Sequence, residues 1–101
     1  MKLDWVNGGA EFVPKTMIGE AEDYLGFVTE ANPKSTSLRD VWKRQLDFIA
    51  GVLSRTDSTI TRSLVGEHVA ISEAADLIVT LIHEPLRPMS TDAPSPVDAG
   101  A

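Results

Sequence analysis

The chain of 101 residues contains no cysteine. Disulfide bonds, thiolate catalysis and cysteine-ligated zinc sites are therefore excluded, and this composition is compatible with a reducing compartment. No apolar run approaches the roughly 20 residues that a membrane-spanning helix requires. The first twelve residues, MKLDWVNGGAEF, also lack the apolar core of a signal peptide. These absences predict a protein that is made and used in the cytoplasm, with no membrane as a partner.

Positive charge is scarce, since nine Lys and Arg residues stand against 15 Asp and Glu, for a formal net charge of −6. Phosphate contacts need a positive surface, so no nucleic-acid partner is expected. The basic residues gather in residues 34–62, between two acidic segments. Ordinary scatter on a solvated surface is the preferred interpretation. The alternative is a basic middle that docks head to tail with copies of the chain or holds an acidic partner segment.

Apolar residues make up 43% of the chain and charged residues 24%, which is typical of a globular protein. We predict a single helical domain over residues 1–84, because the length is ordinary for one domain. Residues 85–101 contain four prolines among small polar residues, and this composition predicts a flexible carboxyl-terminal tail with no core to join.

The strongest helical pattern runs from Ser37 to Ser54, SLRDVWKRQLDFIAGVLS, where apolar residues share one face and charged residues the other. Ser37 and Asp40 have the spacing of a capping box, which marks the start of this helix. Gln45 is the one polar residue within the apolar arc. We expect its amide to hydrogen-bond a backbone group of its own domain, the alternative being that it marks the rim of a contact surface.

The other elements are predicted from turn residues and periodicity. Asn7-Gly8-Gly9 is a tight-turn signal between two short alternating segments, which predicts an amino-terminal β-hairpin. Helices are predicted over Gly19–Glu30, from near Asp57 or Ser58 to Gly66, and over Glu73–His83 with Ser72 as its N-cap. The predicted fold class is mainly α, a small α+β domain with a short hairpin followed by three to four helices and a flexible tail.

No group of residues in the sequence points to catalysis. His68 and His83 are not in register with further ligands, and a metal site needs three or four that converge. The Asn7-Gly8-Gly9 turn lacks the lysine of a phosphate-binding loop. Ser, His and Asp residues occur without a joining motif. We therefore predict a protein that is not an enzyme and has no cofactor or metal.

The order of the segments resembles that of the small tail assembly chaperones of long-tailed bacteriophages. A short strand pair and a proline lead into an acidic helix, and a longer helix ends in LDFIAGVL. A polar break follows, with TITRSLVGEHVAISEAADLIVTLI, in which Ile60 stands where the family more usually has phenylalanine. The resemblance covers roughly residues 2 to 84. It implies a chaperone of the host cytoplasm that binds the tape measure protein and helps to bring in the tail tube protein.

The physical mechanism would be hydrophobic groove binding. The last predicted helix is apolar over more than half its circumference, so a partner helix or another copy of the chain should cover its second side, and a homo-oligomer is expected. The predicted partner-binding residues are Trp42, Gln45, Leu46, Ile49, Leu77, Ile78, Leu81 and Ile82. Two alternatives remain: a structural virion component, such as a connector or tail-completion protein, and a small acidic inhibitor or regulatory protein.

Overall fold

The structure, a computed structural model, describes residues 1–32 and 34–86. These residues form a small all-α domain without strands, so the prediction of a mainly α fold is confirmed. The predicted tail, residues 85–101, lies almost wholly outside the described residues. No helix in the described part of the chain is long and apolar enough to cross a membrane. The elements are η1 (Asn7–Gly9), α1 (Ile18–Glu30), α2 (Leu38–Leu53), α3 (Arg62–His68), α4 (Ile71–His83) and η2 (Glu84–Leu86).

The predicted amino-terminal hairpin is wrong. Its turn residues, Asn7, Gly8 and Gly9, all have positive φ, and they form the 3-10 turn η1. The amide of Val6 donates to the carbonyl of Leu3 at 3.1 Å, and that of Gly9 donates to the carbonyl of Val6 at 2.9 Å. Because these bonds join residues three apart, they use the backbone groups that a cross-strand ladder would need.

The chain nevertheless doubles back at the base of this loop. The amide of Phe12 donates to the carbonyl of Met1 at 2.9 Å, and the amino group of Met1 donates to the carbonyl of Phe12 at 2.6 Å. The tip of the loop is held by Asp57, whose carboxylate accepts the amide of Asn7 at 2.9 Å. Val6 and Phe12 are both buried, so this segment fills part of the core.

Helix α2 runs through the domain and divides into a buried half and an exposed half. Its start is as predicted, because the hydroxyl of Ser37 accepts the amide of Asp40 at 3.1 Å. The buried residues all lie in the second half: Phe48, Ile49, Val52 and Leu53. In the first half, Leu38 is 67% exposed and Trp42 38% exposed. The apolar face of α2 is thus covered only where other elements cross it.

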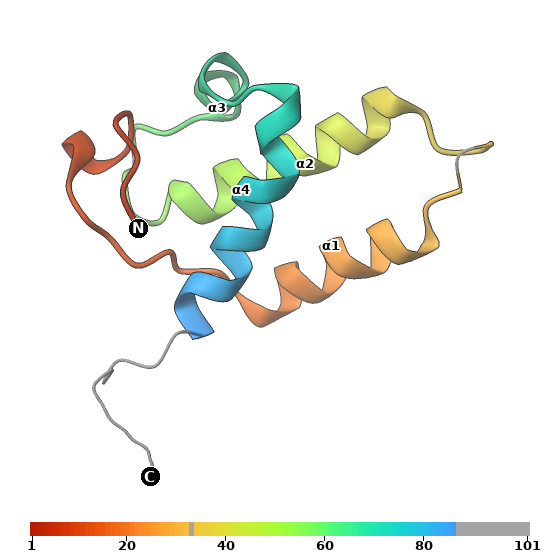
Figure 1. The fold of residues 1–101 in the computed structure, drawn as a ribbon, viewed down its shortest axis with the longest axis horizontal. Helices are drawn as coiled ribbons and strands as arrows, with labels where there is room; N and C mark the ends of the chain where they lie inside the picture. The colour runs from red at the N-terminus through yellow and green to blue at the C-terminus, as the bar shows by residue number, and fades with distance from the viewer. Residues whose placement is uncertain (33, 87–101) are drawn as a thin grey trace, which may run out of the picture.

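Helix α4 crosses α2 (Figure 1) and buries Ala74, Ile78 and Leu81. It ends at His83 as predicted but begins at Ile71, two residues before the predicted start. The prediction of Ser72 as N-cap is wrong, because Ser72 lies inside the first turn. The carboxylate of Glu73 instead accepts the amide of Ala70 at 3.3 Å, which satisfies a backbone donor at the start of α4.

Helix α3 begins later than predicted. Its N-cap is Thr61, whose hydroxyl accepts the amide of Leu64 at 3.2 Å. Asp57 belongs to the preceding turn, where its carboxylate accepts both the amide and the hydroxyl of Thr59, at 3.0 and 2.6 Å. Gly66 does not end the helix, which continues to His68. This stretch therefore contains a turn stabilised by Asp57 and, after it, a separate N-cap at Thr61, where the sequence predicted a single helix start near Asp57.

Helix α1 lies along the outer side of α2 (Figure 1) and has no buried residue. Its amino-terminal end is fixed to the rest of the domain by polar contacts. The two guanidinium nitrogens of Arg55 pair with the two carboxylate oxygens of Glu20, and the hydroxyl of Thr16, two residues before α1, donates to the carbonyl of Leu81 at 2.6 Å. Farther along, α1 touches α2 through Tyr24, whose ring lies 5.2 Å from that of Phe48.

Candidate partner-binding groove

The eight predicted partner-binding residues occupy three different environments. Ile49, Ile78 and Leu81 are 0%, 2% and 0% exposed, and they form the contact between α2 and α4 in the core. A partner cannot reach Ile78 and Leu81 while the domain is folded, and Ile49 is met only as the floor of the groove described below. Their apolar character is explained by the packing of the domain itself.

Leu77 and Ile82 are half-buried against the core and do not reach the groove described below. Leu77 lines a separate hollow on the side of α4 that faces the amino-terminal segment. There the ring of Trp5 stacks on that of His68, with centroids 4.8 Å apart and planes 5° from parallel. The four predicted partner-binding residues of the last helix therefore do not form one continuous surface with those of α2.

Trp42, Gln45, Leu46 and Ile49 lie together, as predicted, in a groove of about 200 Å³. Its other wall is the junction between α3 and α4, which was not predicted. The lining residues from that wall are Gly66, Val69, Ala70, Ile71 and Ala74. We call this feature the α2–α4 groove. Its lining contains no charged residue, and Gln45 supplies the one polar side chain.

Ile71 is the most exposed large apolar residue of the groove, at 70%. Sequence reasoning missed it because the predicted start of the last helix lay at Glu73. The signal that could have found it is the spacing of Ala70 and Glu73, since a glutamate at the third helical position often accepts the N-cap amide. With that start, Ile71 and Ala74 fall on one face of α4, beside Ile78.

The amide of Gln45 has no hydrogen-bond partner within residues 1–32 and 34–86. The expected bond to a backbone group of its own domain is therefore not found there. The side chain is half-buried at the edge of the groove, which agrees with the alternative that it marks the rim of a contact surface. A half-buried amide without a protein partner is available to a ligand or to water.

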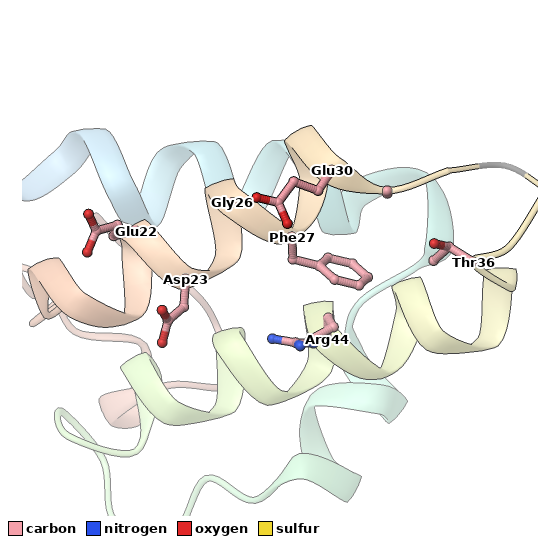
Figure 2. A pocket seen from close by; sticks show the side chains of 8 residues that line it. Glu22, Asp23, Gly26, Phe27, Glu30, Thr36 and Arg44 are labelled. Atoms are coloured by element: carbon pink, nitrogen blue, oxygen red, sulfur yellow. The ribbon is translucent and has the colours of Figure 1, made fainter.

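A second hollow, the acidic cleft, lies between α1 and α2 on a different side of α2 (Figure 2). Its volume is about 650 Å³, and it is lined by the carboxylates of Glu22, Asp23 and Glu30. The guanidinium of Arg44 lies over the ring of Phe27, with its central carbon 4.7 Å from the ring centroid. The described residues contain no group of three or more ligands that could hold a metal ion. The cleft is an open hollow between the two helices, lined by charged side chains.

Shifted pKa values occur at structural contacts rather than in the groove. Partial burial, the largest single effect, raises the pKa of Glu20, but the hydrogen bonds from Arg55 and the Met17 amide, with the charge of Arg55, together lower it below its usual value. The hydrogen bond to Glu20 raises the pKa of Arg55. Hydrogen bonds from the Thr59 side chain, and then from the Asn7 and Thr59 amides, lower the pKa of Asp57. Each of these groups fixes a loop or a helix end.

Another apolar surface lies on α1. Ile18, Leu25 and Val28 are 89%, 50% and 48% exposed, and their spacing places them on one flank of the helix. We call this set the α1 stripe. Of the large apolar residues of α1, Tyr24 packs against the core, whereas the residues of the stripe do not. The domain thus has one apolar groove and one apolar helix flank that nothing in the described chain covers.

Comparison of the chain with protein-family models, with curated proteins and with solved structures finds no match.

Proposed function

We propose that the protein is a non-enzymatic tail assembly chaperone, which binds an apolar helical segment of the tape measure protein in the α2–α4 groove. The groove is the observation that supports this proposal, since it is an uncharged concave site between helices. The identity of the partner, and the accompanying role of the tail tube protein, rest on the resemblance to phage tail assembly chaperones. Host cytoplasm is the proposed place of action.

The chemistry of the groove suits a helix with apolar side chains on one face. Trp42 and Ile71 stand on opposite walls and are 38% and 70% exposed, so a side chain inserted between them would remove apolar surface from water on both sides. Large aromatic side chains in such positions commonly carry much of the binding energy. The amide of Gln45, which has no hydrogen-bond partner among the described residues, would add a directional contact at the rim.

The binding set proposed from this geometry differs from the set predicted from the sequence. Trp42, Gln45 and Leu46 remain, and Ile71 joins them. Ile49 forms the floor of the groove from within the core. Leu77, Ile78, Leu81 and Ile82 are no part of the lining, and their substitution would act through the stability of the domain.

The test is a binding titration of the full chain against helical fragments of a tape measure protein. Ile71→Ser should weaken binding about tenfold or more, because it removes an exposed aliphatic side chain from the groove wall. Val13→Ser is the matched control, since Val13 is similarly exposed, at 60%, but does not line the groove. Unchanged binding by both variants, or no binding by the native chain, would contradict the proposal.

The alternative of a structural virion component uses the same groove and is separated by location. A chaperone is absent from purified particles, whereas a connector or tail-completion protein remains in them. Mass spectrometry of purified particles therefore decides between the two. One or more copies of the chain per particle would show that the protein is a virion component and would contradict the chaperone proposal.

A further inference from the structure

We propose that the chain self-associates head to tail, with the α1 stripe of one copy docked in the α2–α4 groove of the next. The occupant of the groove in the free protein is thus a second copy, and the two contacting surfaces are different parts of the molecule. This inference goes beyond the proposed function, because it concerns what the chain does before any other partner arrives.

The first observation is the orientation of α1. Asp23, Tyr24 and Leu25 follow one another at 100° steps around the helix. Asp23 lines the acidic cleft and Tyr24 packs on Phe48 of α2, so Leu25 projects from the opposite flank. Leu25 is 50% exposed there, with Ile18 and Val28 nearby on the same flank. Helix α1 is therefore amphipathic, and the α1 stripe is the apolar side that it can present to a partner.

The second observation is that α1 cannot reach the groove of its own molecule. Glu20 is paired with Arg55, and the hydroxyl of Thr16 is bonded to the carbonyl of Leu81, so the start of α1 is tied beside the end of α4. The groove lies at the start of α4, where Ile71 and Ala74 contribute to its wall. An α1 stripe that enters this groove must come from another copy.

The third observation is charge. Helix α1 carries Glu20, Glu22, Asp23 and Glu30 and has no basic residue. The exposed first half of α2, which forms one wall of the groove, carries Arg39 and Lys43 against the single Asp40, while Arg44 faces α1 of its own molecule. Glu22 and Glu30 lie beside the α1 stripe, so two stripes placed against each other would bring like charges together, which is unfavourable. An α1 helix placed along the first half of α2 brings acidic residues to basic ones.

These surfaces make the contact heterologous. Each copy then offers one free α1 stripe and one free groove, so association continues into short chains or closes into a ring, and salt weakens it. A partner helix that enters the groove must displace α1 of the neighbouring copy. If the proposed function is right, binding of the partner helix therefore dissociates the self-associated form into single copies, each bound to the partner.

The experiment is sedimentation velocity of the full chain with two variants. Leu25→Asp places a charge on the α1 stripe and leaves the groove intact. Ile71→Asp places a charge in the groove and leaves α1 intact, and a carboxylate at the first position of α4 suits that end of the helix. Each variant alone should be a monomer, with association weakened by about tenfold or more. Mixed in equal amounts, they should form a one-to-one pair and nothing larger, because one intact stripe meets one intact groove.

The outcomes separate this proposal from others. Val13→Asp, at an exposed apolar site outside both surfaces, should associate as the native chain does. Glu22→Lys, an exposed reversal of charge on α1, should weaken self-association without altering an apolar side chain, because it removes an attraction to the basic residues of α2. A native chain that stays monomeric at millimolar concentration overturns the proposal, as does a mixture of the two Asp variants that stays monomeric.

The same variants keep the two proposals distinguishable. Leu25→Asp should bind a tape measure fragment at least as tightly as the native chain does, because its groove is unchanged and no neighbouring α1 occupies it. Loss of self-association with retained fragment binding supports both proposals. Self-association without fragment binding supports this inference alone and removes the proposed function.

Discussion

Helices α1 and α4 each have 13 residues, and each carries an apolar face, yet the fold uses them differently. Helix α4 buries Ala74, Ile78 and Leu81, whereas α1 buries no residue. The difference teaches that an apolar stripe predicts which side of a helix could be buried but not whether the domain has a surface left to bury it against.

The surface of α2 explains the difference. Its second half contributes Phe48, Ile49, Val52 and Leu53 to the core, and these are met by α3, by α4 and by Val6 of the amino-terminal segment. Once that half is covered, α1 is left with the flank of α2 that carries Phe48 and Arg44. An aromatic contact and a cation–π contact then replace a packed core.

The largest expected contrast is between two Leu→Ala substitutions. Leu81→Ala removes a side chain that is 0% exposed and should lower the free energy of unfolding by about 2–5 kcal/mol, because a cavity remains. Leu25→Ala removes a side chain that is 50% exposed on α1 and should change it by less than about 0.5 kcal/mol. Urea unfolding followed by far-ultraviolet circular dichroism measures both. Equal losses would mean that α1 is as much part of the core as α4.

The helices were the predictable part of the fold. Periodicity placed both ends of α2 and the start of α1 within one residue, and it placed the ends of α1 and α4 correctly, because apolar spacing over three or more turns is a strong signal. The amino-terminal segment was not predictable in the same way. Asn7-Gly8-Gly9 was correctly identified as a turn, but positive φ at three successive residues led to local turn bonds instead of a strand pair.

The candidate site was predictable only on the α2 side. Trp42, Gln45 and Leu46 were identified because α2 is long and its apolar and charged residues separate clearly onto two faces of the helix. The other wall depends on how α3 meets α4, and that junction was placed wrongly by a few residues at each helix start. Which of the apolar residues of α4 point to α2 is decided by the crossing of the two helices, and no local pattern encodes that crossing.

The next largest effect is expected at the pairing of Arg55 with Glu20, which fixes α1 to the rest of the domain. Arg55→Ala removes both hydrogen bonds to Glu20 and the 2.8 Å bond to the carbonyl of Lys15, and should lower the free energy of detaching α1 by about 1–2 kcal/mol. Amide hydrogen exchange should accelerate in α1 and stay unchanged in α4. The control is Arg62→Ala, whose partner Asp47 is 52% exposed, with an expected effect of about 0.5 kcal/mol or less. Equal acceleration in α4 would show that the two helices open together.

A smaller effect is expected from acid. The pKa of Glu20 is lowered in the folded state, so its contact with Arg55 stabilises α1 fully above the usual value of 4.5 and progressively less as the pH falls through the folded pKa. The nuclear magnetic resonance signals of Tyr24 and Phe27 should therefore broaden or shift below pH 4.5 before those of Ile78 change. In Glu20→Gln this acid-dependent step should disappear. A step that persists in the variant would assign the loss to another carboxylate, such as Asp57.

The smallest expected effect is a gain of stability confined to α1. A Cβ atom added at Gly26 meets nothing within 4 Å, so Gly26→Ala should stabilise the helix by about 0.5–1 kcal/mol through the restricted backbone of alanine. Gly51→Ala in α2 is the matched control, since its Cβ would meet only a carboxylate oxygen of Glu20, at 3.6 Å. If α1 opens separately, Gly26→Ala slows hydrogen exchange in α1 and leaves the global urea midpoint unchanged, whereas Gly51→Ala raises that midpoint. A global midpoint raised equally by both substitutions would mean that α1 unfolds together with the rest of the domain, and that the exposed α1 stripe is no sign of a separately opening helix.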